Sequence, residues 1–414
     1  MGYQSFLILF LAIIAVSFIG SQVLNYLNRR SNAQALPEDL NDIYDPEQYK
    51  QAMAYQAATG KFELVSSTFS FLVLFTVIAT GFLGQIDAWA RYHFLWELPQ
   101  ALAFFGVLFL GSDLLALPFS LYGTFVIEKR FGFNKTTLKT FVLDKLKGYV
   151  ITAIIGGLLL SVFIFFVFWR GTEFWLWFWA VAILFMLLAN TFFTSLILPL
   201  FNKLTPLPDG ELKTAIEAYA AKVKFPLNNI LVIDGSKRSA KSNAFFTGWG
   251  RRKKVVLYDT LLQQHTTDEL VAILAHEVGH YKKKHIITGL VIGIAQIGLT
   301  LFVLSLMIYN TDISLAMGGN KTSYHLNLLA FGILYSPITQ LLGLAQNAHS
   351  RKNEFEADAF AASTADPMAM ISALKKLTSH NLSELLPHSW YVFFNYSHPP
   401  VRQRLNALKS VSDR

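Results

Sequence analysis

The sequence predicts a mainly α-helical, polytopic membrane protein with a small α/β insert, and three observations predict this fold class. Of the 414 residues, 53% are hydrophobic and only 15% are charged, whereas about a quarter of the residues in soluble domains are charged. Seven separate stretches are apolar and long enough to cross a bilayer, which needs about 20 residues. One long region, 202–285, is polar and contains short strand-like runs.

The seven apolar stretches are the predicted transmembrane helices. The first could instead be a cleaved signal peptide, but no Lys or Arg precedes it and it is longer than a typical signal-peptide core. A retained helix is therefore favoured. The spans cover residues 5–25, 65–86, 99–126, 149–169, 174–200, 286–309 and 326–347.

The basic residues predict the orientation of these spans. Of the 35 lysines and arginines, 32 lie in the connections and the tail on one side, and only Arg91, Arg170 and Lys321 lie on the other. The positive-inside rule places the basic side in the cytoplasm. We therefore expect an integral, multi-pass protein in a lipid bilayer, with the N-terminus outside and the insert and C-terminus cytoplasmic. No nucleic-acid partner is expected.

Several spans contain polar or helix-bending residues, and their meaning stays open. A carboxylate inside a membrane is costly and usually faces a cavity or a partner, so these residues could line a water-filled interior. Alternatively, Asp113 lies near an interface and Pro118 only bends its helix. The residues concerned are Asp113, Pro118, Asn190, Gln296, Pro337 and Gln340.

The residue pattern of the insert predicts a small α/β module that ends in a helix. Residues 229–234 (NILVID) and 254–258 (KVVLY) have the composition of strands, with 243–247 (NAFFT) between them. Thr266 and Glu269 form a capping-box pattern, which predicts that a helix starts there. The helix would continue through the apolar positions that follow and carry residues 276–280.

Residues 276–280 read HEVGH, an HExxH signature. On a helix, His276 and His280 share one face at i and i+4, so both imidazoles can bind one Zn²⁺. Glu277 can then act as the general base toward a water molecule that zinc activates. The chain has no cysteine, so a zinc ion would have to be held by histidine and carboxylate.

A third ligand is expected from a later carboxylate. The three-histidine pattern of the metzincins would need Gly and His where this chain has Lys283 and Ile286, so that class is excluded. In the run NEFEAD at 353–358, Glu354 and Asp358 share one helical face. Glu354 could bind zinc while Asp358 accepts a hydrogen bond from a ligand imidazole. The competing interpretation is a solvated turn of charged residues, which the presence of an HExxH motif elsewhere in the chain makes less favourable.

Two other histidines, His285 and His398, lie in a context that indicates a role. His285 follows His280 by five residues, which rotates it off the ligand face, and we interpret it as an interfacial residue after the lysine run at 282–284. His398 precedes two prolines, so its backbone is extended, and the prolines can open a helix that carries Arg402 and Arg404. A histidine and an arginine near a zinc site could stabilise the oxyanion or hold the substrate backbone, and packing or surface roles remain open.

These residues together resemble the type I CAAX prenyl protease family, the integral-membrane zinc endopeptidases. The resemblance covers nearly the whole chain. It rests on RFGFNK at 130–135, PLFNK at 199–203, NAFF at 243–246, HEVGH, NEFEAD, and SHPP at 397–400.

The resemblance implies a barrel of seven helices around an intramembrane chamber, with a zinc site at its cytoplasmic face. It implies the ligands His276, His280 and Glu354, with Glu277 as base. Asn243, His398 and Arg404 match positions that family members use to bind the substrate backbone and the developing oxyanion. The family's reaction is endoproteolysis near the C-terminus of a prenylated substrate.

The sequence thus predicts four parts: membrane helices in 1–200, a zinc-protease module in 201–285, two more membrane helices in 286–348, and a tail in 349–414 with the third ligand. The expected function is a zinc metalloendopeptidase with one Zn²⁺ per chain, which cleaves near the C-terminus of lipidated or membrane-associated polypeptides. The alternatives are a membrane quality-control protease with no prenyl requirement and a non-enzymatic seven-helix transporter or receptor.

Overall fold

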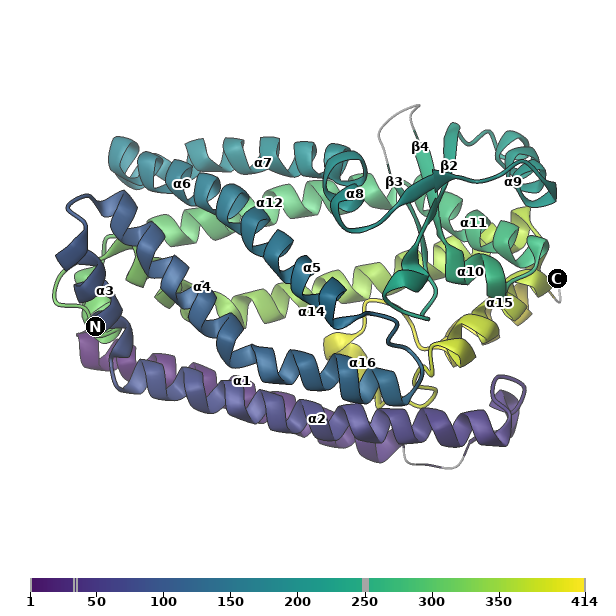
Figure 1. The fold of residues 1–414 in the computed structure, drawn as a ribbon, viewed down its shortest axis with the longest axis horizontal. Helices are drawn as coiled ribbons and strands as arrows, with labels where there is room; N and C mark the ends of the chain where they lie inside the picture. The colour runs from purple at the N-terminus through teal and green to yellow at the C-terminus, as the bar shows by residue number, and fades with distance from the viewer. Residues whose placement is uncertain (1, 33, 35, 248–252, 413–414) are drawn as a thin grey trace.

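The computed structural model describes residues 2–32, 34, 36–247 and 253–412. The molecule is elongated: long helices run along most of its length, and a small sheet with its covering helices lies at one end (Figure 1). The N-terminus lies at the other end, and the C-terminus lies beside the sheet and its helices. The two ends of the chain are therefore separated by most of the length of the molecule.

Six helical segments of the described chain are long and apolar enough to cross a membrane. One of them joins α4 (Glu97–Tyr122) to the π-helical segment η2 (Gly123–Glu128), and another runs from Leu138 to Phe201. The remaining four are α1 (Tyr3–Asn32), α2 (Pro46–Ala79), α12 (His285–Ser305) and α14 (Tyr324–Thr364).

The segment Leu138–Phe201 has 64 residues and contains two of the predicted spans, 149–169 and 174–200. It bends back at η4 (Gly171–Glu173), where Gly171 has a φ of +55°, a conformation that glycine adopts more easily than other residues. Its helical parts are α5 (Leu138–Ile151), η3 (Thr152–Gly156), α6 (Gly157–Arg170), α7 (Phe174–Phe192), η5 (Phe193–Ile197) and α8 (Leu198–Phe201). The helices α6 and α7 pack against each other across this bend.

At the N-terminal end of the molecule, a buried polar cluster joins α3 (Phe82–His93) to the start of α14. His325 is fully buried, and its Nε2 lies 2.6 Å from Oδ1 of Asp87 on α3. The guanidinium of Arg91 pairs with the same carboxylate at 3.0 Å. The short helix α13 (Thr311–Ala316) packs between α1 and α14 nearby. This end of α14 is thus anchored by a charged contact.

The sheet has four strands in the order β1-β2-β4-β3. Its central pair, β2 (Leu227–Ile233) and β4 (Lys253–Tyr258), is parallel, and both edge strands are antiparallel to their neighbours. The predicted strands at 229–234, 243–247 and 254–258 are confirmed as β2, β3 (Ala244–Thr247) and β4, with small shifts of their bounds. The edge strand β1 (Leu204–Pro206) was not predicted, because three residues that include a proline carry little strand signal.

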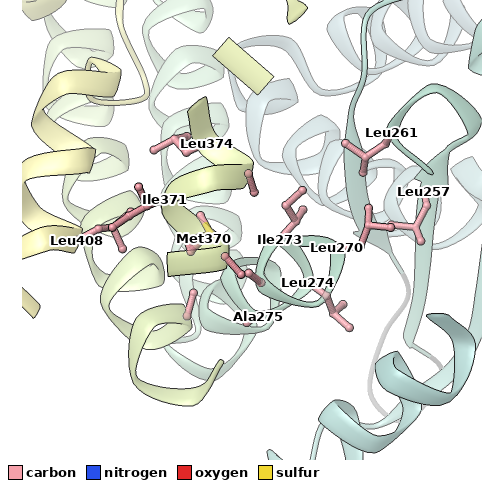
Figure 2. Close-up of a cluster of buried hydrophobic side chains, with 14 of the residues drawn as sticks. Leu257, Leu261, Leu270, Ile273, Leu274, Ala275, Met370, Ile371, Leu374 and Leu408 are labelled. Atoms are coloured by element: carbon pink, nitrogen blue, oxygen red, sulfur yellow. The ribbon is translucent and has the colours of Figure 1, made fainter. Parts of the chain in front are cut away.

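Helices cover the sheet and continue into the C-terminal part of the chain. Figure 2 shows α11 (Thr267–Lys282) between two partners: Leu257 of β4 and Leu261 of α10 (Asp259–Gln264) on one side, and Met370, Ile371 and Leu374 of α15 (Pro367–His380) on the other. The other helices of this part are α9 (Glu211–Lys222), α16 (Ser389–Asn395) and α17 (Val401–Ser412). Burial on both sides fixes the position of α11.

A cavity of about 1910 Å³ lies among the long helices. Its walls are mostly apolar side chains of α2, α4, α5, α6 and α14, among them Phe69, Phe105 and Leu328. The carboxylate Asp113 on α4 is bound by two groups of α5, Lys145 Nζ at 2.6 Å and Tyr149 Oη at 2.5 Å. The carboxylate in the predicted third span therefore has a charged partner on the neighbouring helix.

Candidate metal centre

The two motif histidines lie on α11, the most buried helix of the insert. Thr266 accepts a hydrogen bond from the Glu269 amide, and Glu269 accepts one from the Thr266 amide, so the predicted capping box is confirmed. The next turns place His276 and His280 on one face, where their Nε2 atoms lie 3.1 Å apart. Two imidazole nitrogens therefore face the same point in space.

Glu354 on α14 supplies the third group. Its Oε1 lies 3.3 Å from His280 Nε2, and its Oε2 lies 3.5 Å from His276 Nε2. The three possible ligand atoms lie within 4.8 Å of one another. The structure thus brings together residues that are more than seventy positions apart in the sequence.

Gly279 allows this approach of α11 to α14. A Cβ at this position would lie 2.9 Å from Ala357 Cα and 3.0 Å from Ala357 O. These distances are shorter than a normal van der Waals contact, so a side chain at 279 would push the two helices apart. The glycine of the HEVGH motif is therefore a packing residue for the site.

The residues present fit a metal ion. Oε2 of Glu354 is buried and accepts no hydrogen bond from any described residue; its nearest positive or imidazole groups, Arg404 Nη1 and His276 Nε2, lie 3.5 Å away. Burial alone would lower the pKa of His276, but the carboxylates of Asp358 and Glu354 raise it to about 9. The pocket therefore stabilises positive charge between the three side chains. A divalent cation bound by two imidazoles and one carboxylate would supply that charge.

Asp358 orients the first of the two histidines. Its Oδ1 lies 2.8 Å from His276 Nδ1, and its side chain is only 2% exposed. Arg404 on α17 binds the same carboxylate with two groups, Nε at 2.8 Å and Nη2 at 2.6 Å. Nη1 of Arg404 also lies 3.5 Å from Glu354 Oε2. The predicted pairing of Asp358 with a ligand imidazole is present in the structure.

Glu277 is partly exposed beside the two imidazoles. Burial raises the pKa of its carboxyl group, and the neighbouring His276 and His280 oppose that rise. A carboxylate with an elevated pKa is better suited to accept a proton near neutral pH than an ordinary glutamate. Glu277 therefore combines a raised pKa with a position beside both imidazoles.

His398 reaches the same site from the loop before α17. Its Nε2 lies 3.3 Å from Glu354 Oε1, and Ser397 Oγ lies 3.0 Å from its Nδ1. Asn243 lies just before the edge strand β3, where its side chain accepts a hydrogen bond from the Ala244 amide. Among the described residues, Asn243 makes no hydrogen bond to the three metal-site residues.

His285 has two partners that its place in the sequence did not predict. Its Nδ1 lies 3.0 Å from His280 Nδ1, and its Nε2 lies 3.1 Å from Glu356 Oε2. Lys284 has a φ of +60°, so α11 ends and α12 starts in a new direction at His285. The lysine run before the apolar span at 286 was the available signal for this break.

Two further sequence motifs hold the insert against the bundle. Residues 133–135 pair with residues 238–240 through backbone hydrogen bonds such as Lys135 N to Arg238 O at 3.0 Å. Asn202 of the 199–203 motif donates to Asp234 Oδ1 at 3.0 Å. Both motifs therefore position the sheet rather than contact the metal site.

The comparisons with known proteins agree with this geometry. Residues 25–203 match a family model described as CAAX prenyl protease N-terminal, five membrane helices, and residues 206–412 match peptidase family M48. Curated relatives named CAAX prenyl protease 1 homolog include one from Oryza sativa, 33% identical over 94% of this chain and 93% of its own length. Another, from Homo sapiens, is 31% identical over 91% and 89%.

A solved structure is also similar over nearly the whole chain. The crystal structure of S. mikatae Ste24p superposes with a TM-score of 0.93 at 32% sequence identity and covers 97% of this chain and 99% of that one. The similarity therefore includes both the helical bundle and the part that carries the histidines.

Proposed function

The chain belongs to peptidase family M48 and is a membrane metalloendopeptidase, and from this premise we propose its metal, its site residues and its substrate class. The metal is one zinc ion per chain. The substrate is a lipidated or membrane-associated polypeptide that is cleaved near its C-terminus. The observation that carries the proposal is the convergence of His276, His280 and Glu354 within 4.8 Å.

The donor set favours zinc. Two imidazole nitrogens and one carboxylate oxygen, with no thiolate, are typical of catalytic zinc sites that keep one position open. Bound zinc would act as a Lewis acid and lower the pKa of a water ligand to about 7. His276, His280 and Glu354 would hold it, and Asp358 would fix the orientation of the His276 ring.

The other site residues have complementary roles. Glu277 accepts a proton from the attacking water and then delivers it to the leaving amine. His398, at the rim of the site, donates a hydrogen bond to the oxygen on which negative charge develops. Arg404 reaches the same pocket and contributes to substrate binding, while two of its groups hold Asp358 in place.

The edge strand β3 offers a docking site for the peptide part of the substrate. An extended peptide can add to a free sheet edge through main-chain hydrogen bonds, and Asn243 precedes this strand on the chain. The apolar cavity of about 1910 Å³ is larger than most small-ligand pockets, which measure roughly 300–1,000 Å³. It is large enough to take the lipid group of a substrate.

The chain crosses the membrane seven times in this proposal. A straight helix of 64 residues would be about 96 Å long, roughly three times the hydrocarbon core of a bilayer, so α6 and α7 would cross separately. The N-terminus is outside, and the metal centre and the C-terminus are cytoplasmic. The location of 32 basic residues on one side supports this orientation.

The test uses the full-length protein in lipid nanodiscs with two competing peptides of one sequence. Both end in a C-a-a-X motif, and only one carries a prenyl group on its cysteine. Products are identified by mass spectrometry, and the metal content is measured on the same sample. The expected result is one zinc per chain and preferential cleavage of the prenylated peptide near its C-terminus.

Each other outcome corrects a different part of the proposal. Equal cleavage of both peptides would favour a quality-control protease with no prenyl requirement. Protein that folds but binds no stoichiometric metal would overturn the metal centre and favour the transporter or receptor alternative.

A further inference from the structure

The structure joins the second motif histidine to a carboxylate through another histidine. His285 is buried at the first position of α12, with its Nδ1 3.0 Å from His280 Nδ1. Its other ring nitrogen lies 3.1 Å from Glu356 Oε2. The three residues therefore form a continuous chain of contacts that leads away from the metal site.

The direction of each hydrogen bond follows from the chemistry of the partners. His280 presents Nε2 to Glu354 and His276, so a metal would bind that nitrogen in its deprotonated form. The Nδ1 of a neutral imidazole bound in this way carries the proton. It can only donate to His285 Nδ1, so His285 carries its own proton on Nε2 and donates it to Glu356. An ionised carboxylate only accepts, so Glu356 fixes both tautomers.

The two metal-site histidines are thus supported in different ways from the same helix. His276 contacts Asp358 directly at 2.8 Å, whereas His280 reaches Glu356 through His285. Glu354 and Asp358 lie on one face of α14, and Glu356 lies on a different face. Helical geometry therefore prevents Glu356 from contacting His280 directly. His285 lies between the two residues and contacts both of them.

We propose that His285 is a positioning residue for His280 and that Glu356 holds His285 in the required orientation and tautomer. This inference rests on the proposed metal centre. Partners of this kind usually change metal affinity by roughly 10- to 100-fold when they are removed. All three acidic residues of NEFEAD then serve the site, one as a ligand and two as supports.

The test measures zinc affinity by chelator competition on the full-length protein, together with the absorption spectrum of its Co²⁺ form. His285→Leu should weaken zinc binding roughly 10- to 100-fold and change the Co²⁺ spectrum. His285→Gln should retain most of the affinity, because its amide oxygen can accept from His280 while its amide nitrogen donates to Glu356. Glu356→Leu should resemble His285→Leu.

Lys352→Met is the matched control. Lys352 lies 3.8 Å from Glu356 Oε1 and is itself largely exposed, and the lysine contacts neither imidazole in the chain of hydrogen bonds. This variant should bind zinc like the parent. The melting temperature of the metal-free protein is measured for all variants, so that a loss of folding can be separated from a loss of affinity.

Parental affinity and an unchanged Co²⁺ spectrum in both His285→Leu and Glu356→Leu would overturn the inference. A fall in the melting temperature alone, with normal affinity of the folded protein, would do the same, because it would mean that His285 only packs. Absence of metal from the parent protein would instead overturn the proposed metal centre itself.

Discussion

Arg404 binds Asp358 with two groups of its guanidinium, at 2.8 Å and 2.6 Å, in a pocket where both side chains are almost fully buried. Oδ1 of Asp358 accepts from both Arg404 and His276. The C-terminal helix α17 therefore helps to orient a metal-site residue on α11, through a carboxylate on α14. Three helices that are separated in the sequence are joined by one carboxylate.

The first prediction concerns this buried pair. Arg404→Met should destabilise the protein by about 3–5 kcal/mol, because it removes the charged partner of a buried carboxylate. It should also weaken zinc binding, because Arg404 no longer holds Asp358, the partner of His276, in place. Thermal denaturation and chelator competition measure the two effects.

A matched control lies on the same helix. Arg402 binds Asp39 at 2.8 Å and 3.1 Å, but both side chains are more than 40% exposed. Exposed ion pairs contribute about 0–1 kcal/mol to stability, so Arg402→Met should hardly change the free energy of unfolding or the zinc affinity. Equal losses in the two variants would contradict the role of burial.

The second prediction separates metal binding from proton transfer. Glu277→Gln keeps the shape of the side chain and removes its ability to accept a proton. Peptide hydrolysis should fall by about 10²–10⁴-fold, while the zinc content stays at the parental value. If the variant cleaves as fast as the parent, Glu277 is not the base.

The third prediction concerns removal of the metal. A strong chelator should inactivate the enzyme and lower its melting temperature, because a ligand that binds only the folded state stabilises it by about 2.7 kcal/mol at 100 times its dissociation constant. Added zinc should restore both properties. Glu354→Ala, which lacks the carboxylate ligand, should show a much smaller response to either treatment.

The fourth prediction concerns the contact between α11 and α14. Gly279→Ala should destabilise the protein by about 1–3 kcal/mol, as overpacking does, and should separate the histidines from Glu354. Activity and zinc affinity should therefore fall together. Gly289→Ala is the control, because a Cβ at that helical position meets nothing within 4 Å; this variant should be as stable as the parent.

The fifth prediction tests the topology. The chain has no cysteine, so a single introduced cysteine is its only thiol. A membrane-impermeant reagent added outside sealed vesicles of known orientation should label Leu95→Cys and Glu173→Cys on the same side. Lys409→Cys should be labelled only from the opposite side. Labelling of Glu173→Cys together with Lys409→Cys would contradict separate crossings by α6 and α7.

Local signals in the sequence predicted much of the site. The capping box at Thr266 and the i,i+4 spacing of His276 and His280 are properties of a single helix, so they could be read from a short window. Glu354 could be predicted because a zinc site with two histidines needs a third ligand, and a carboxylate can supply it. Its actual distance from the histidines depends on the packing of α11 against α14 at Gly279, which a short window cannot show.

The parts that were missed depend on backbone geometry or on distant contacts. The contacts of His285 with His280 and Glu356 could not be predicted, because they depend on the left-handed conformation of Lys284, where α12 takes a new direction. The strand β1 is defined by its pairing with β2 rather than by its own three residues. The partner of Asp113 was not predictable either, because Lys145 lies on another helix and was interpreted as part of a cytoplasmic loop.

The length of α14 has a mechanical consequence. One helix runs from the buried His325–Asp87 contact to Glu354, 29 residues later, a distance of about 44 Å at 1.5 Å per residue. A pivot of 5° about the anchored end would shift the carboxylate by about 4 Å on that geometry, enough to break coordination. The close packing of Gly279 on α11 against Ala357 on α14 opposes such a pivot and so keeps the carboxylate beside the histidines.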